Sequence, residues 1–122
     1  MSKCILVVED NEDNRQILRV LLRKSGFEMI EAHDGEAALT IAAAKRPDLI
    51  LMDVQLPGID GYEAIRRLKA QPALRAIPII VVTSYALSGD EAKARAAGCD
   101  AYIAKPYDTK RLLAMIREFL PS

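Results

Sequence analysis

Five polar residues, spread over most of the chain, have side chains that could act together in one reaction. They are the carboxylates Glu9, Asp10 and Asp53, the hydroxyl of Thr83 and the ammonium of Lys105. Three carboxylates brought close together repel one another strongly unless a cation neutralises them. Oxygen ligands without His or Cys suit Mg²⁺ or Mn²⁺, and a phosphate oxygen of the substrate commonly completes a Mg²⁺ site. These residue types therefore indicate metal-assisted chemistry on a phosphoryl group.

Each of these residues stands at the end of a short apolar run that is typical of a buried strand. Glu9 and Asp10 follow the first run, and Lys105 follows the last. Asp53 is the last residue of the third run, and Thr83 is the last residue of the fourth. The runs predict strands at 5–8, 27–32, 48–53, 77–83 and 101–104.

Longer segments with helical spacing separate the strands. In the first segment the apolar stripe consists of Ile17, Leu18, Leu21 and Leu22. Helices are predicted at 12–25, 35–45, 62–70, 90–97 and 108–120. This alternation predicts an α/β fold, a doubly wound parallel sheet of five strands with helices on both faces. Ligands of such sheets bind beyond the carboxyl ends of the strands, where the polar residues are expected.

Composition and charge favour one domain and exclude several classes of function. The 122 residues are 51% hydrophobic, which suffices for a core and excludes disorder, so residues 1–122 are expected to form one domain. Seventeen Lys and Arg balance seventeen Asp and Glu, so no net field attracts nucleic acid or a membrane surface. Cys4 and Cys99 are too few and too distant for a disulfide framework or a zinc site. Without a signal peptide or membrane-spanning run, a cytoplasmic protein is expected.

Taken singly, each polar residue has an ordinary structural explanation. An Asp at a strand end is usually a helix cap, a lone Lys is usually solvated, and a lone Thr usually fills a strand. Their conjunction at four strand ends is what favours a shared phosphoryl-transfer site.

The order and spacing of these residues resemble the signature of a known family. Glu9-Asp10, Asp53, Thr83 and Lys105-Pro106 match the response-regulator receiver domains of two-component signalling, the CheY-like family. The resemblance covers essentially the whole chain. It implies the strand order 2-1-3-4-5, with strands numbered along the chain.

The resemblance also implies a role for each carboxylate. Asp53 would accept a phosphoryl group from a histidine kinase or a histidine phosphotransfer protein and become an aspartyl phosphate. Asp10, Asp53 and the backbone carbonyl of Gln55 would hold Mg²⁺, while Glu9 would act through a bound water. Such a chain is a signalling domain and not a classical enzyme, because it assists only its own phosphotransfer and dephosphorylation.

In the same family, the phosphoryl group is read by a conformational switch. Lys105 would pair with one phosphoryl oxygen, and the Thr83 hydroxyl would donate to another. Thr83 would thereby move inward, and Tyr102, which resembles the switch aromatic of the family, would fill the vacated space. For Tyr102 the alternative is an ordinary half-buried tyrosine on an edge strand. The changed surface, which would bind a downstream protein, comprises helix 90–97, strand 101–104 and helix 108–120.

Four further positions are predicted to tune or direct the reaction. Gln55 and Tyr85 occupy places that control access of the hydrolytic water in this family, and the bulky Tyr85 predicts a long-lived phosphorylated state. Val20 lies off the core stripe of its helix. Because the helices of phosphodonor proteins dock beside this helix in the family, Asn14 and Val20 are candidate partner contacts.

The end of the chain predicts how the signal leaves the domain. Only Pro121 and Ser122 follow the last helix, so output by protein contact without an output domain is expected. The runs EDNE at 9–12 and DVQLP at 53–57 resemble the DivK type of stand-alone receivers, which regulate histidine kinases in relays. Similar runs occur in receivers of hybrid kinases. The alternatives are therefore a domain derived from such a kinase or a phosphate-independent interaction module.

Two other protein classes share part of the pattern. Phosphatases of the haloacid dehalogenase type also use a strand-end Asp and Mg²⁺, but they need a second Asp where this chain has Gln55. They also carry the nucleophile on the first strand. Flavodoxin-like cofactor binders need a hydroxyl- and glycine-rich loop after the first strand, where the acidic run 9–13 would repel a phosphate. Both classes are disfavoured.

Overall fold

Five strands alternate with five helices in the computed structural model of the chain, which describes residues 2–56, 58–83, 90–105 and 108–121. The strands are β1 (Cys4–Val8), β2 (Glu28–Ala32), β3 (Leu49–Asp53), β4 (Ile79–Thr83) and β5 (Ala101–Ala104). The helices are α1 (Glu12–Lys24), α2 (Gly35–Lys45), α3 (Gly61–Ala70), α4 (Asp90–Ala97) and α5 (Thr109–Phe119). Each predicted element is present.

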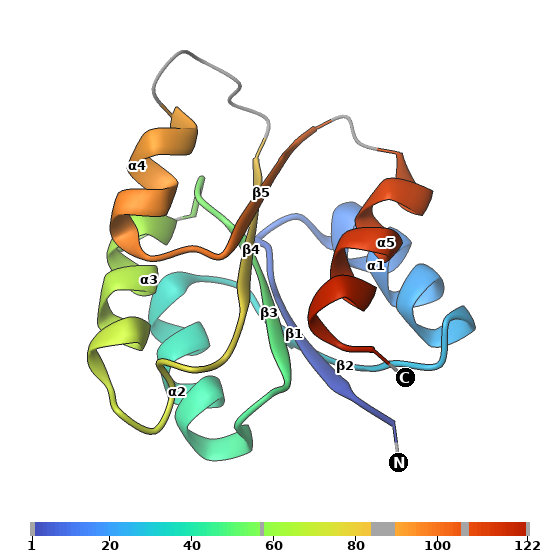
Figure 1. The fold of residues 1–122 in the computed structure, drawn as a ribbon, viewed down its shortest axis with the longest axis horizontal. Coiled ribbons are helices and arrows are strands. Elements are labelled where there is room, and N and C mark those ends of the chain that lie inside the picture. Colours follow the sequence, from blue (N-terminus) through green and yellow to red (C-terminus); the bar gives the residue numbers. More distant parts are fainter. Residues whose placement is uncertain (1, 57, 84–89, 106–107, 122) are drawn as a thin grey trace.

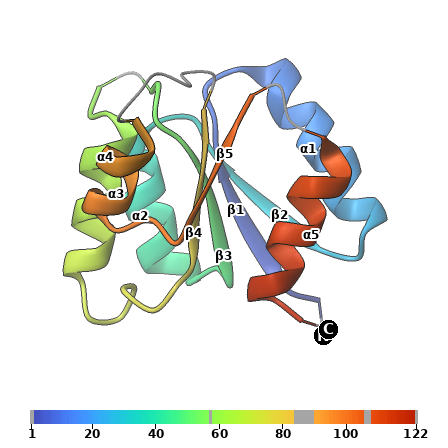
Figure 2. The same ribbon diagram turned by 45° about the horizontal axis from the view of Figure 1, so that its top comes forward.

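The strands form one parallel sheet in the order β2-β1-β3-β4-β5, which confirms the predicted doubly wound fold. Helices α1 and α5 cover one face, and α2, α3 and α4 cover the other (Figures 1 and 2). The chain reverses its direction of travel along the sheet after β2. The carboxyl ends of β1 and β3 therefore lie side by side at the switch point, where a site is expected.

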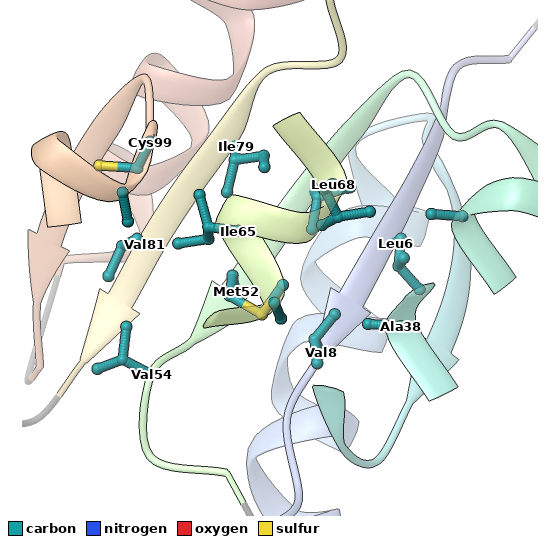
Figure 3. Close-up of a cluster of buried hydrophobic side chains, with 14 of the residues drawn as sticks. Leu6, Val8, Ala38, Met52, Val54, Ile65, Leu68, Ile79, Val81 and Cys99 are labelled. Carbon is teal, nitrogen blue, oxygen red and sulfur yellow. The ribbon is translucent and has the colours of Figure 1, made fainter. Parts of the chain in front are cut away.

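The sheet divides the hydrophobic core into two clusters. Leu6 and Val8 of β1 belong to the cluster beneath α2, α3 and α4, which Figure 3 shows. Ile5 and Val7 belong to the cluster beneath α1 and α5, because successive strand residues point to opposite faces. All residues of β3 and β4 are buried, as expected for strands covered on both faces.

The observed helices and strands begin and end within a residue or two of the predicted bounds, and local hydrogen bonds explain several of the differences. The carboxylate of Asp108 accepts a hydrogen bond from the Lys110 N–H, so Asp108 caps α5 and is not its first residue. At the C-terminal end of α1, Ser25 is the C-cap. The helix therefore ends at Lys24, one residue before the end of the predicted helix 12–25. Strand β4 begins at Ile79 because the Ile77 N–H donates to the Leu74 carbonyl in the preceding turn.

The prediction that Ile17 of α1 belongs to the core-facing stripe is wrong. The sequence predicts Ile17 in the apolar stripe, yet 56% of Ile17 is exposed, whereas Leu18 and Leu22 are buried. Leu18 and Leu22 lie one above the other at i, i+4 spacing, and Ile17 is turned about 100° from Leu18. Val20, predicted to lie off the stripe, is 53% exposed. Within the described ranges, no helix has both the length and the apolar character needed to cross a bilayer.

Candidate functional site

Three carboxylates meet at the carboxyl ends of two neighbouring strands. Asp53 is the last residue of β3, and Glu9 and Asp10 directly follow β1, its neighbour in the sheet. One oxygen from each carboxylate lies within 4.8 Å of the others. Glu9 and Asp53 are buried, at 4% and 6% exposure, while Asp10 is open to solvent. The predicted convergence of the acidic residues is therefore present.

Lys105 reaches into this cluster from the end of β5. Its Nζ donates to Glu9 Oε1 at 2.8 Å and to Asp53 Oδ2 at 3.3 Å, so one ammonium bridges two carboxylates. The backbone N–H of Lys105 donates to the Thr83 carbonyl at 2.6 Å. That bond ties the base of the lysine to the end of β4, in line with the pairing of Thr83 and Ala104.

The surroundings shift the pKa values of the two buried carboxyls, Asp53 and Glu9, in opposite directions. Burial raises the pKa of Asp53 to about 6, against the opposing effects of the Gln55 N–H and the Lys105 charge. Burial also acts to raise the pKa of Glu9, but the hydrogen bond and charge of Lys105 outweigh it and leave that pKa below its usual value. For Lys105, burial is outweighed by the two carboxylates, which raise its pKa. Of the two buried carboxyls, Asp53 is thus the one whose ionised form the protein stabilises less.

The Glu9 carboxylate has two further donors, both from the start of α1. Asn14 Nδ2 donates to Glu9 Oε1 at 3.2 Å, and the Asn11 N–H donates to Glu9 Oε2 at 3.4 Å. Asn14, proposed from the sequence as a partner contact, is half-buried and directs its amide to Glu9. Side chains of a first helical turn lean toward the helix N-terminus, so a helix that follows the acidic pair directly could have revealed this contact.

A buried arginine that the sequence did not single out holds the backbone of Glu9. Arg15 is 5% exposed, and its Nη1 donates to the Glu9 carbonyl at 2.7 Å. Its guanidinium also pairs with Glu12 at 2.5 Å and with Glu31 of β2 at 3.1 Å. Arg19 donates to the same Glu31 carboxylate at 2.7 Å. This network ties the end of β1 to α1 and β2.

Gly61 allows α3 to approach the end of β3 closely. A Cβ at this position would lie 2.5 Å from Val54 Cα and 2.6 Å from the Asp53 carbonyl oxygen. The Gly61 N–H donates to the Val54 carbonyl at 3.2 Å. The first turn of α3 therefore packs directly on the backbone that carries Asp53, and only glycine admits this packing.

The remaining predicted site residues occupy different surroundings. The Gln55 N–H donates to Asp53 Oδ1 at 2.8 Å, and the Gln55 side chain is exposed. Thr83 is fully buried at the end of β4. Tyr102 is half-buried in β5 and packs against the cluster beneath α2, α3 and α4. Tyr85 and Pro106 lie outside the described residues.

The carboxylate oxygens of Glu9, Asp10 and Asp53 are suitable ligands for a hard divalent cation. Among the described residues the group consists only of carboxylates, with two of the three side chains buried and one open to solvent. Mg²⁺ prefers oxygen ligands and keeps several waters, for which the exposed side at Asp10 leaves access. Asp10 and Asp53 would hold the ion, with Glu9 beside them.

Comparison with known proteins identifies the family. A sequence profile described as the response regulator receiver domain matches residues 5–117. The chain belongs to this family. Receiver domains are signalling domains, and one similar curated protein is the polar-differentiation response regulator DivK of Brucella anthropi. That protein is 46% identical over 120 residues, which cover 98% of each chain.

Solved receiver domains share the fold over nearly the full length of the chain. One is the receiver domain of a sensor histidine kinase from Pseudomonas aeruginosa PAO1, with 38% identity, a TM-score of 0.92 and full coverage of both chains. It holds a magnesium ion in its active-site cleft. Another is the chemotaxis protein CheY4 of Vibrio cholerae, with 27% identity and a TM-score of 0.91 over 98% of this chain and 99% of the other.

Proposed function

We propose that the protein is a phosphoacceptor response regulator of a two-component system or phosphorelay, with Asp53 as the acceptor. The observation that carries this proposal is the position of Asp53: its carboxylate is buried at the end of β3, and the Lys105 ammonium bridges it to Glu9. Residues 1–122 would form one receiver domain and act in the cytoplasm. Similarity to DivK and to a kinase-attached receiver supports this assignment.

The proposed reaction transfers a phosphoryl group from a phosphohistidine to Asp53. A carboxylate oxygen of Asp53 attacks phosphorus, and the P–N bond breaks with its electron pair going to the imidazole, which takes up a proton from water. Mg²⁺ or Mn²⁺, when bound by Asp10, Asp53 and the Gln55 carbonyl with Glu9 acting through a water, supplies charge that offsets repulsion between the acceptor and the phosphoryl oxygens. The magnesium in the cleft of the Pseudomonas receiver supports this part of the proposal.

Two residues would read the new phosphoryl group. Lys105 already lies 3.3 Å from Asp53 Oδ2 and would shift its ammonium to a phosphoryl oxygen. The hydroxyl of Thr83, whose carbonyl is bonded to the Lys105 N–H, would donate to another oxygen. Tyr102 would follow Thr83 inward. The surface formed by α4, β5 and α5 would then change and bind a downstream protein.

The phosphodonor is proposed to be a histidine kinase or a histidine phosphotransfer protein. Val20 is exposed on α1, the helix that follows Asp10, so a donor docked there would stand near the acceptor. That Asn14 also contacts the phosphodonor protein stays a prediction.

Mapping the phosphorylated residue tests this function. The protein is treated with acetyl phosphate and Mg²⁺, then reduced with borohydride, which converts an aspartyl phosphate to homoserine. Peptide mass mapping should place the conversion at Asp53 and nowhere else. The exposed-cap variant Asp108→Asn should be converted equally, because Asn caps a helix as well as Asp. Conversion at another carboxylate, with Asp53 intact, would refute the assignment.

A further inference from the structure

One oxygen atom of Glu9 is shared by two donors of different kinds. Glu9 Oε1 accepts from Lys105 Nζ at 2.8 Å and from Asn14 Nδ2 at 3.2 Å. The side chain of Glu9 is 5% exposed, so water does little to replace either donor. Its other oxygen accepts a longer bond, 3.4 Å, from the Asn11 N–H. A buried carboxylate oxygen that loses its donor is strongly destabilised.

Lys105 is not committed to Glu9, because the same ammonium also contacts Asp53. When Asp53 carries a phosphoryl group, the proposed function draws Lys105 toward the phosphoryl oxygens, where the negative charge is greater. Glu9 Oε1 then loses its short, charge-assisted bond. The second side-chain donor to that oxygen in the described part of the chain, the amide of Asn14, makes no contact with Asp53 that would draw it away, so it would remain.

We propose that Asn14 is a positioning residue that holds the Glu9 carboxylate at the metal site when Lys105 leaves it. The inference rests on the proposed function only for the event that moves Lys105. The amide suits this task because it is neutral. It satisfies a buried oxygen without adding positive charge that would repel Mg²⁺, as a second lysine or an arginine would.

The anchoring of Asn14 supports this role. Its backbone N–H donates to the side chain of the N-cap Asn11 at 3.0 Å, which fixes the first turn of α1. The next residue, Arg15, is buried and donates to the Glu9 carbonyl at 2.7 Å. The first turn of α1 therefore holds Glu9 by its backbone and by its carboxylate, on a helix that does not depend on Lys105.

A double-mutant cycle on Mg²⁺ affinity tests the inference without phosphorylation. Lys105→Met removes the ammonium at similar length, and Asn14→Leu removes the amide at similar volume in a good helix former. The Mg²⁺ dissociation constant is measured by calorimetry for the wild type, both single variants and the double variant. Gln16→Leu, an exposed amide on the same helix, serves as the matched control in both backgrounds. Urea unfolding verifies that each variant is folded, and Asn14→Ala replaces Asn14→Leu if the latter is not.

The expected result is an effect that depends on the background. Asn14→Leu should weaken Mg²⁺ binding about twofold when Lys105 is present, and roughly tenfold in Lys105→Met, the size expected for a hydrogen bond to a charged group. Equal effects in both backgrounds, or no effect in Lys105→Met, would overturn the inference. Acetyl phosphate labelling of the wild type is measured in parallel. Absence of labelling would refute the proposed function, whereas the positioning of Glu9 is judged by the cycle alone.

Discussion

Neutralising Asp53 should stabilise the metal-free protein, because burial makes its ionised form unfavourable. The pKa of Asp53 is raised from 3.8 to about 6 by burial, against the Gln55 N–H and with a further contribution from Glu9. At about 1.4 kcal/mol per pKa unit, this rise of roughly two units corresponds to about 3 kcal/mol. Asp53→Asn keeps the shape of the protonated acid, so it should raise the free energy of unfolding at pH 7 by about 3 kcal/mol.

The sign of the pH dependence follows from proton linkage. Because the folded pKa lies above the unfolded one, the folded state binds more protons between pH 4 and pH 6, and stability falls as pH rises through that window. The Asp53→Asn variant has no ionisable group at this position, so it does not lose this stability as the pH rises. The stability difference between the variant and the wild type should therefore be near zero at pH 4, grow toward pH 6 and level off by pH 7.

Urea unfolding in EDTA between pH 4 and pH 7.5 measures this difference. Asp108→Asn is the matched control and should follow the wild type, since Asp108 is an exposed helix cap. Mg²⁺ at ten times its dissociation constant should stabilise the wild type by about 1.4 kcal/mol and the Asp53→Asn variant by less. A variant less stable than the wild type at pH 7, or a difference that does not change with pH, would refute the reasoning.

Three further predictions concern other parts of the site. Gly61→Ala should destabilise the protein by about 2 kcal/mol in urea unfolding and slow acetyl phosphate labelling, because its Cβ would overlap Val54 Cα; unchanged values would contradict the close approach. Hydrogen bonding from Arg19 lowers the pKa of Glu31 below 4.5, so Glu31→Gln should cost about 1 kcal/mol at pH 7, and that cost should fade as pH drops below 4.5. A cost that persists at pH 3 would argue against the ion pair. Val20→Asp should slow phosphotransfer from a histidine phosphotransfer protein severalfold and leave acetyl phosphate labelling unchanged; equal slowing of both would exclude docking at α1.

The fold and the acidic cluster could be predicted because each depends on strong local signals. The apolar runs of β1, β3 and β4 are buried on both faces and lack alternation, which identified a parallel sheet. Asp53 ends β3 and Lys105 follows β5, and the carboxyl ends of parallel strands lie at one edge of the sheet, so both residues could be predicted to lie there. The strand order itself came from the family resemblance.

The residues that support the cluster were harder to predict because their roles depend on tertiary contacts. An arginine in a helix is usually solvated, yet Arg15 is buried, where it donates to the Glu9 carbonyl and forms ion pairs with Glu12 and Glu31. The sequence predicts Asn14 only as a partner contact, because helix periodicity does not reveal that the first turn of α1 leans over Glu9. The sequence predicts Ile17 in the apolar stripe, but the side of α1 that faces the core buries Leu18 and Leu22 and leaves Ile17 exposed.

The most direct test of the central claim is the intact mass of the protein after incubation with acetyl phosphate. The experiment compares Mg²⁺ with EDTA, and the wild type with Asp53→Asn. One phosphoryl adduct on the wild type, present with Mg²⁺ and absent in EDTA and in Asp53→Asn, is the predicted result. An adduct of equal yield on Asp53→Asn, or no adduct on the wild type under any condition, would contradict the assignment of Asp53 as the phosphoacceptor.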